Sequence, residues 1–195
     1  MNWKGYFGPI AAILLVVGVV TLALLVPGYD PIRQTVSEIG EVGSPMERAF
    51  TLLLSTVAAC LLVFATSVRD ASRAAGHSTL AAWFVGVMAL SVAGVGLFSF
   101  PHPLHNVFGL SELVGYQAPL VLAITWRKER SAIVGVSWLM AVLVWVAIVL
   151  NLATLDRQGA LFTFERPFYG LIQRALFLAW FGWCAITGMM LARRR

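Results

Sequence analysis

Residues 5–26 read GYFGPIAAILLVVGVVTLALLV, an apolar run without a single charged side chain. A helix needs about 20 mostly apolar residues to cross the hydrocarbon core of a bilayer, so this run predicts a transmembrane helix. Pro27 and Gly28 follow it directly and are typical of a helix end. The run is too long for the hydrophobic region of a signal peptide and lacks a small-residue cleavage site, so we expect it to remain in place.

Five further apolar blocks follow, separated by short polar segments. They predict an all-α fold, a polytopic transmembrane bundle of six helices in which residues 1–195 form a single domain. Hydrophobic residues make up 59% of the chain and charged residues 12%, whereas soluble domains carry about 25% charged residues. The expected spans are 5–26, 45–68, 79–98, 107–126, 132–152 and 169–191.

The net charge of +5 does not indicate a nucleic-acid partner, because the basic residues lie in short loops between apolar blocks. There they set the orientation in the membrane. With the N-terminus in the cytoplasm, the cytoplasmic loops hold Lys4, Arg69, Arg73, Arg127, Lys128, Arg130, Arg193, Arg194 and Arg195, and the opposite loops hold Arg33, Arg48, Arg157 and Arg166. This asymmetry predicts an inner-membrane protein with both termini in the cytoplasm. Trp3, Trp83 and Trp126 fall near the expected cytoplasmic interface, as in an aromatic belt.

The first polar segment, residues 29–50, reads YDPIRQTVSEIGEVGSPMERAF. Asp30 can cap a short helix that starts at Pro31 and ends at Gly40. Its apolar and polar residues would lie on different faces, which predicts an amphipathic helix lying in the membrane interface. Residues 44–47, SPME, form a capping-box pattern with proline at the first helical position, and predict the start of the second span.

The expected topology places three polar stretches on the non-cytoplasmic side: residues 30–47, the link FPHPLHN at 100–106, and the loop at 153–168. Glu112 and Arg174 lie about two turns inside their spans. A charge at that depth costs roughly 3 kcal/mol on insertion scales and usually faces the bundle interior with a partner. We therefore expect the two to approach each other, as a simple ion pair, or to share a ligand in a pocket on that side. Gly109 would leave room for such a ligand.

His102 and His105 are spaced to lie on one side of a helix, which raises the possibility of a metal site. Pro103 between them favours a second interpretation, in which they cap the helix and hydrogen-bond to the interfacial helix. We expect no metal and no cofactor, because a haem relay would need histidines deep in facing spans. Cys60 and Cys184 both fall inside expected spans and are interpreted as buried free thiols.

The candidate acid–base residues are Glu38, His105 and Glu112. Ser37 could act as a nucleophile beside Glu38, or both could make local hydrogen bonds. The candidate ligand-binding residues are Asp30, Arg33, Gln34, Ser37, His102, Asn106, Arg166, Gln173 and Arg174.

Two stretches carry a family resemblance. TVSEIGEVGSPMERAF after the first span and FPHPLHNVFG after the third resemble the signatures of the bacterial integral membrane family known as domain-of-unknown-function family 998. More distantly, S-E-x-G followed by P-x-E-R-x-F is similar to the pattern of the Frag and DRAM-type membrane proteins, with Glu38 where that family places aspartate. The resemblance implies a six-helix fold and hints at a lipid ligand. The residues it marks as a site or a structural latch are Ser37, Glu38, Gly40, Pro45, Glu47, His105 and Asn106.

Together these features favour a pocket roofed by residues 31–39 that binds a lipid headgroup or another amphipathic molecule. Arg33, Arg166 or Arg174 would face an anionic group. A membrane-embedded lipid hydrolase or transferase is the second hypothesis. A small transporter ranks lower, because neither broken helices nor midplane polar groups are evident. A structural subunit would dock a partner through the small residues of the third span, a seam formed by Ala82, Gly86, Ala89, Ala93 and Gly96.

Overall fold

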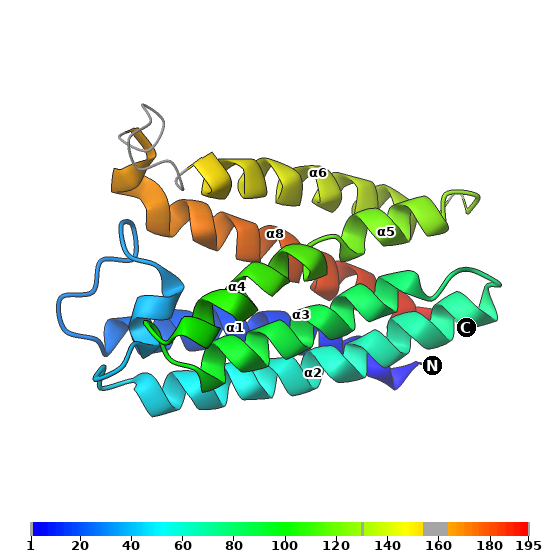
Figure 1. Ribbon diagram of the computed structural model, residues 1–195. Helices are drawn as coiled ribbons and strands as arrows, with labels where there is room; N and C mark the ends of the chain where they lie inside the picture. Colours follow the sequence, from blue (N-terminus) through cyan, green and yellow to red (C-terminus); the bar gives the residue numbers. More distant parts are fainter. Residues whose placement is uncertain (1, 130, 154–163, 195) are drawn as a thin grey trace.

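The computed structural model describes residues 2–129, 131–153 and 164–194 (Figure 1). Within these ranges the chain is helical, and six segments are long and apolar enough to cross a membrane. The all-α class and the expected number of spans are thereby confirmed. The α-helices are α1 (Phe7–Leu24), α2 (Glu47–Ala74), α3 (Leu80–Leu97), α4 (Pro103–Gly115), α5 (Ala118–Thr125), α6 (Ala132–Ala153) and α8 (Tyr169–Arg193). The 3-10 helices are η1 (Trp3–Tyr6), η2 (Val36–Gly40) and η3 (Arg166–Phe168).

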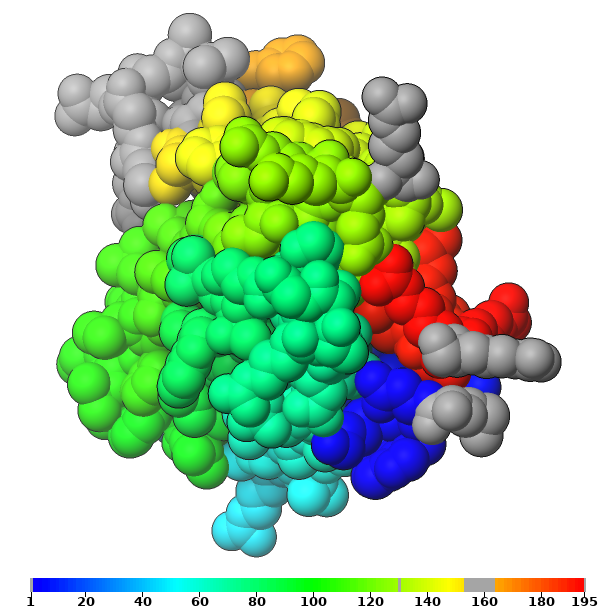
Figure 2. Space-filling view, turned by 90° about the vertical axis from the view of Figure 1, so that its right-hand side faces the viewer, coloured from blue at the N-terminus to red at the C-terminus, as the bar shows by residue number. Residues whose placement is uncertain are grey.

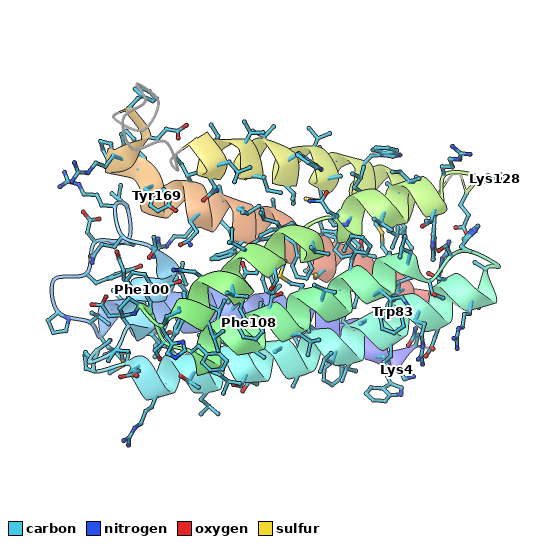
Figure 3. All side chains as sticks on the ribbon, viewed as in Figure 1. Lys4, Trp83, Phe100, Phe108, Lys128 and Tyr169 are labelled. Atoms are coloured by element: carbon cyan, nitrogen blue, oxygen red, sulfur yellow. The ribbon has the colours of Figure 1, made fainter. Side chains whose placement is uncertain are left out.

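The helices run roughly along one common direction (Figure 1). α3 packs between α2 and α4, while α8 packs against both α1 and α6. Both chain ends lie at one end of the bundle, which we call the terminal end. Phe100 and Tyr169 lie toward the opposite end, the cavity end, whereas Lys4, Trp83 and Lys128 lie at the terminal end (Figure 3).

The centre of the bundle is filled by large side chains. Phe64, Trp180 and Trp183 are fully buried, and the rings of Phe64 and Trp183 meet edge to face at 6.0 Å. Small residues allow the backbones to approach, because an added Cβ at Gly8 would lie 2.2 Å from the Cys184 carbonyl oxygen. Burial of Cys184 and of Cys60 as free thiols confirms the expectation for both cysteines.

The fourth expected span is not one continuous helix, which corrects the sequence prediction. α4 ends at Gly115 and α5 begins at Ala118, with a turn at Tyr116 and Gln117. Pro119 has no N–H to donate to the carbonyl four residues earlier, that of Gly115. The indole nitrogen of Trp180 on α8 donates to that carbonyl instead, at 3.1 Å. A broken helix is therefore present. The sequence prediction had ranked a transporter low partly because no broken helix was evident, and that expectation was wrong.

The interfacial helix expected at residues 31–39 is absent from the described structure. Residues 31–34 form a turn, in which the Asp30 carboxylate accepts the Ile32 N–H at 2.9 Å. Thr35 is extended (φ −71°, ψ 157°) and starts the short helix η2. The expected helix fails because the Thr35–Glu38 capping box places a helix start in the middle of it.

The second span begins and ends later than predicted. α2 starts at Glu47, whose carboxylate accepts the Gly43 N–H at 3.0 Å, and it continues to Ala74 through the expected polar turn. The extension is held by contacts from other elements. Lys4 pairs with Asp70 at 2.8 Å, and Ser72 accepts a hydrogen bond from the Trp126 indole at 3.3 Å.

At the terminal end, N-terminal residues lie beside C-terminal residues (Figure 2). Here Glu129 accepts hydrogen bonds from Arg194 and, at 2.8 Å, from His77. The guanidinium of Arg194 lies 4.9 Å from the ring centre of Trp126. The His77 side chain is therefore largely shielded from solvent. The fully buried Trp126 is not a belt residue, contrary to the prediction, whereas Trp3 and Trp83 are exposed.

The small residues of the third span face the neighbouring helix rather than a free surface. Ala82 and Ala89 are buried, and an added Cβ at Gly96 would lie 2.8 Å from the Leu54 Cβ on α2. Gly86 is the exception, since a Cβ there would meet open space. Most of this seam therefore supports packing within the chain.

Candidate ligand-binding cavity

A cavity of about 470 Å³ lies among α1, α2, α3, α4, α8 and the loop that carries η2. This volume falls in the range of roughly 300–1,000 Å³ that is usual for small-molecule sites. Its apolar wall consists of Leu15, Val36, Phe50, Leu54, Met88, Val92, Val95, Phe100, Gly109, Leu110, Phe177 and Phe181. Its polar wall consists of Thr35, Ser37, His105, Asn106, Glu112, Tyr116, Tyr169 and Gln173. Asn106 and Leu110 are also exposed, so the cavity reaches the surface at α4.

His105 joins three parts of the chain at the cavity wall. Its ring is buried, with Nδ1 2.8 Å from the Phe98 carbonyl oxygen and Nε2 3.0 Å from Ser37 Oγ. A carbonyl oxygen can only accept, so Nδ1 carries the proton and Nε2 accepts from the Ser37 hydroxyl. This agrees with the interpretation in which His105 hydrogen-bonds to the segment after the first span.

His102 has a different role from that of His105. It is exposed and caps α4, with Nδ1 accepting the Leu104 N–H at 3.1 Å, and its ring stacks on Phe98. This is the capping role that the sequence predicted. In the part of the chain that the structure describes, no three His, Cys, Asp or Glu side chains gather into a metal-binding group.

Glu112 and Arg174 do not form the expected direct pair. Glu112 lines the cavity and accepts a hydrogen bond from Tyr116, its neighbour one turn along, at 3.0 Å. Arg174 lies outside the cavity wall. Its guanidinium donates to the Gln34 and Gly170 carbonyl oxygens, both at 2.9 Å, and to the Tyr29 hydroxyl. Glu112 therefore pairs with a residue one helical turn away. Arg174 pairs mainly with a loop whose position the sequence did not predict.

The Arg174 contacts fix the loop after α1 onto α8. Tyr29 donates in turn to the Thr35 carbonyl oxygen at 2.8 Å. One residue from Arg174, Gln173 accepts the Val36 N–H at 2.7 Å and also lines the cavity. An added Cβ at Gly170 would lie 2.4 Å from the Gln34 carbonyl oxygen, so glycine is required for this close approach.

Glu38 has a structural contact rather than a place in the cavity wall. Its carboxylate accepts the Thr35 N–H at 3.0 Å and thereby completes the cap of η2. Burial raises the pKa of the Glu38 carboxyl above its usual value, against the opposing effect of the Thr35 hydrogen bond.

The other sequence candidates divide into two groups. Ser37, Asn106 and Gln173 line the cavity with His105 and Glu112. Asp30, Arg33, Gln34, His102, Arg166 and Arg174 lie outside its wall, and their contact with a ligand stays a prediction. Arg33 is mostly exposed and lies 3.6 Å from the Asp30 carboxylate. Thr35 and Tyr169 also line the cavity but carry no local signal in the sequence, because only the fold brings the loop before η2 and the start of α8 to one cavity.

These elements define a six-span integral membrane protein with a partly polar cavity near one end of the bundle. The chain belongs to the family described as Protein of unknown function (DUF998), whose sequence model matches residues 9–190. This confirms the family resemblance seen in the two signature stretches. Comparisons with curated proteins and with solved structures returned no match.

Proposed function

We propose that this protein binds an amphipathic membrane lipid in the cavity. The strongest support for this proposal is that the cavity wall has one polar part and one apolar part. Polar groups from Ser37, His105, Glu112 and Gln173 face a space whose remaining surface is built mainly from Leu, Val, Met and Phe side chains. A few hydrogen-bonding groups in an apolar cavity suit a ligand with one polar part and one hydrocarbon part.

The polar wall favours a lipid whose head is neutral or carries an amine. Among the described residues that line the cavity, none is Lys or Arg, and Glu112 is a carboxyl group. A phosphate would lack the bidentate guanidinium partners that usually bind it. The proposed headgroup therefore differs from the anionic one expected from Arg33, Arg166 and Arg174. Hydroxyl, amide and amine groups match the donors and acceptors on the wall.

Gly109 offers a direct test. It lines the cavity, and an added Cβ would meet open space, so Gly109→Trp should fill the cavity without a clash in the backbone. Native mass spectrometry of the purified protein should show bound lipid in the wild type and a loss of at least tenfold in Gly109→Trp. Gly86→Trp is the matched control, since it is equally open but lies away from the cavity.

Equal occupancy in the wild type and in Gly109→Trp would overturn the proposal. So would the absence of bound lipid from the wild type after extraction in mild detergent and after incubation with monoacylglycerol or sphingoid-base micelles.

We also propose that the cavity end faces away from the cytoplasm in an inner membrane. The excess of Lys and Arg in the loops of the terminal end supports this orientation. Val42 and Ser78 are exposed and lie in loops at opposite ends of the bundle. A membrane-impermeant maleimide should label Val42→Cys in intact cells and Ser78→Cys only after permeabilisation. The reverse pattern would invert the orientation.

A further inference from the structure

The pair formed by Ser37 and His105 has the geometry of a nucleophile and its base. The Ser37 Oγ lies 3.0 Å from His105 Nε2, and the Phe98 carbonyl oxygen fixes the ring from its other side at 2.8 Å. A third group that orients the base in the correct tautomer is the common feature of serine-based acyl transfer sites. Both side chains line the cavity, so a bound molecule can reach the hydroxyl.

We propose that Ser37 and His105 are a catalytic dyad that hydrolyses an acyl ester of the bound lipid. The proposal rests on the proposed function, because the substrate is the amphipathic ligand of the cavity. It needs only water as a second reactant. Ester groups of membrane lipids lie between the hydrocarbon core and the headgroups. η2 packs against α1 and α2, and the proposal places it at the depth of those ester groups.

In the first step the Ser37 oxygen forms a bond to the acyl carbon while its proton moves to His105 Nε2. The ester C–O bond then breaks, and the proton passes from Nε2 to the leaving alcohol. In the second step water attacks the acyl-serine and gives a proton to Nε2. The Ser37–acyl bond breaks, the carboxylic acid leaves, and the proton returns to the Ser37 oxygen.

Asn106 supplies a candidate donor for the oxyanion that forms in each step. Its side chain lines the same cavity directly after His105. Within the ranges that the structure describes, its amide makes no side-chain hydrogen bond, so the NH₂ group is available. Removing one such donor from an acyl transfer site typically costs about 100-fold to 1,000-fold in rate.

An alkyl fluorophosphonate tests the dyad without knowledge of the substrate, because it modifies only activated serines. The folded wild type in detergent should gain the mass of one probe, and peptide mass spectrometry should place it on Ser37. Ser37→Ala should abolish labelling. His105→Gln should slow it by about 100-fold or more, because the general base is lost. Ser111→Ala is the matched control and should label as the wild type does, since Ser111 pairs with Ser91 outside the cavity wall.

Hydrolysis of p-nitrophenyl octanoate provides the second readout and should follow the same order among the variants. Thermal unfolding in detergent identifies variants that fail to fold, and the position of the probe on the wild-type chain needs no variant. A folded wild type that gains no probe, or gains it on another serine, would overturn the dyad. Bound lipid without labelling would overturn the dyad alone, whereas the absence of both would also overturn the proposed function.

Discussion

Two side chains from different helices hold the loop after α1 in place. Arg174 on α8 fixes residues 29–34 through the Gln34 carbonyl oxygen and the Tyr29 hydroxyl. His105 on α4 fixes η2 through Ser37. Both contacts give hydrogen-bond partners to polar atoms of an irregular loop that lies beside apolar side chains. An irregular loop at a membrane boundary needs such partners, because unpaired backbone groups are costly there. The wall that η2 contributes to the cavity depends on both.

Arg174→Ala should lower the free energy of unfolding by about 1–3 kcal/mol, because several hydrogen bonds to a charged group are lost. Arg33→Ala is the matched control. Its side chain is 72% exposed, so the change should stay within about 0.5 kcal/mol. Thermal unfolding in detergent measures both, and equal shifts in the two variants would contradict the structural role of Arg174.

Among single residues, the sequence identified five of the eight described polar residues that line the cavity. Glu112 was predictable because a charge inside a span is rarely accidental. His105 was predictable from its spacing to His102 and from the family resemblance.

The loop partners of Arg174 were not predictable, since the Gln34 carbonyl oxygen could be supplied by any residue and only the fold brings Tyr29 to α8. Thr35 and Tyr169 carry no local signal, because only the fold brings the loop before η2 and the start of α8 together in the wall.

The break between α4 and α5 shows how one element compensates for another. Pro119 leaves the Gly115 carbonyl without its usual donor, and the Trp180 indole fills that role. Tyr116, the first residue of the break, donates its hydroxyl to Glu112 in the cavity wall at 3.0 Å. The geometry of the cavity therefore depends on a contact between two helices that the sequence separates widely.

Trp180→Phe should cost about 1–3 kcal/mol of stability beyond its packing loss, because the Gly115 carbonyl becomes a buried acceptor without a donor. Adding Pro119→Ala should recover part of that cost, since an alanine N–H can donate to the same carbonyl. Trp183→Phe is the matched control. Its indole donates to Ser137 Oγ, so Pro119→Ala should not rescue it. Equal recovery in both backgrounds, measured by thermal unfolding, would contradict the account of the break.

At the element scale, the number of spans followed from the lengths of the apolar runs. The ends of the helices were predicted less accurately, because contacts between distant parts of the chain determine where a helix ends. α2 extends to Ala74 because Lys4 and Trp126 bind its last turns. Pro119 was the available signal for the broken helix, and Thr35 with Glu38 was the signal against a continuous interfacial helix. Both signals are local, whereas the predictions of a continuous fourth span and of an interfacial helix were based on the spacing of apolar residues.

In the whole molecule, charged contacts join separate segments at the terminal end, and the cavity lies toward the opposite end. Glu129 joins His77 and Arg194, so it ties the turn before α3, the loop after α5 and the C-terminus together. Desolvation raises the pKa of the Glu129 carboxyl, but the hydrogen bonds from Arg194 and His77 outweigh it and hold the pKa below its ordinary value of 4.5.

A carboxyl whose pKa is lower in the folded state stabilises the fold above its unfolded pKa, and this contribution is lost as the pH falls through the folded value. The wild type should therefore melt at a higher temperature than Glu129→Gln near pH 7, by a few degrees. The difference should shrink progressively below about pH 4.5. Exposed Glu41→Gln serves as the control. A difference between wild type and Glu129→Gln that stays constant down to about pH 3 would contradict this account.

We propose that the cavity among α1, α2, α3, α4 and α8 holds the hydrocarbon part of a lipid. Photo-crosslinking with a monoacylglycerol that carries a diazirine near the end of its acyl chain tests it most directly. The account predicts that peptide mass spectrometry finds the label on cavity residues such as Val92, Leu110 and Phe177, and that Gly109→Trp removes it. Label confined to exposed side chains of α6, such as Leu139 and Val146, and unchanged by Gly109→Trp, would contradict it.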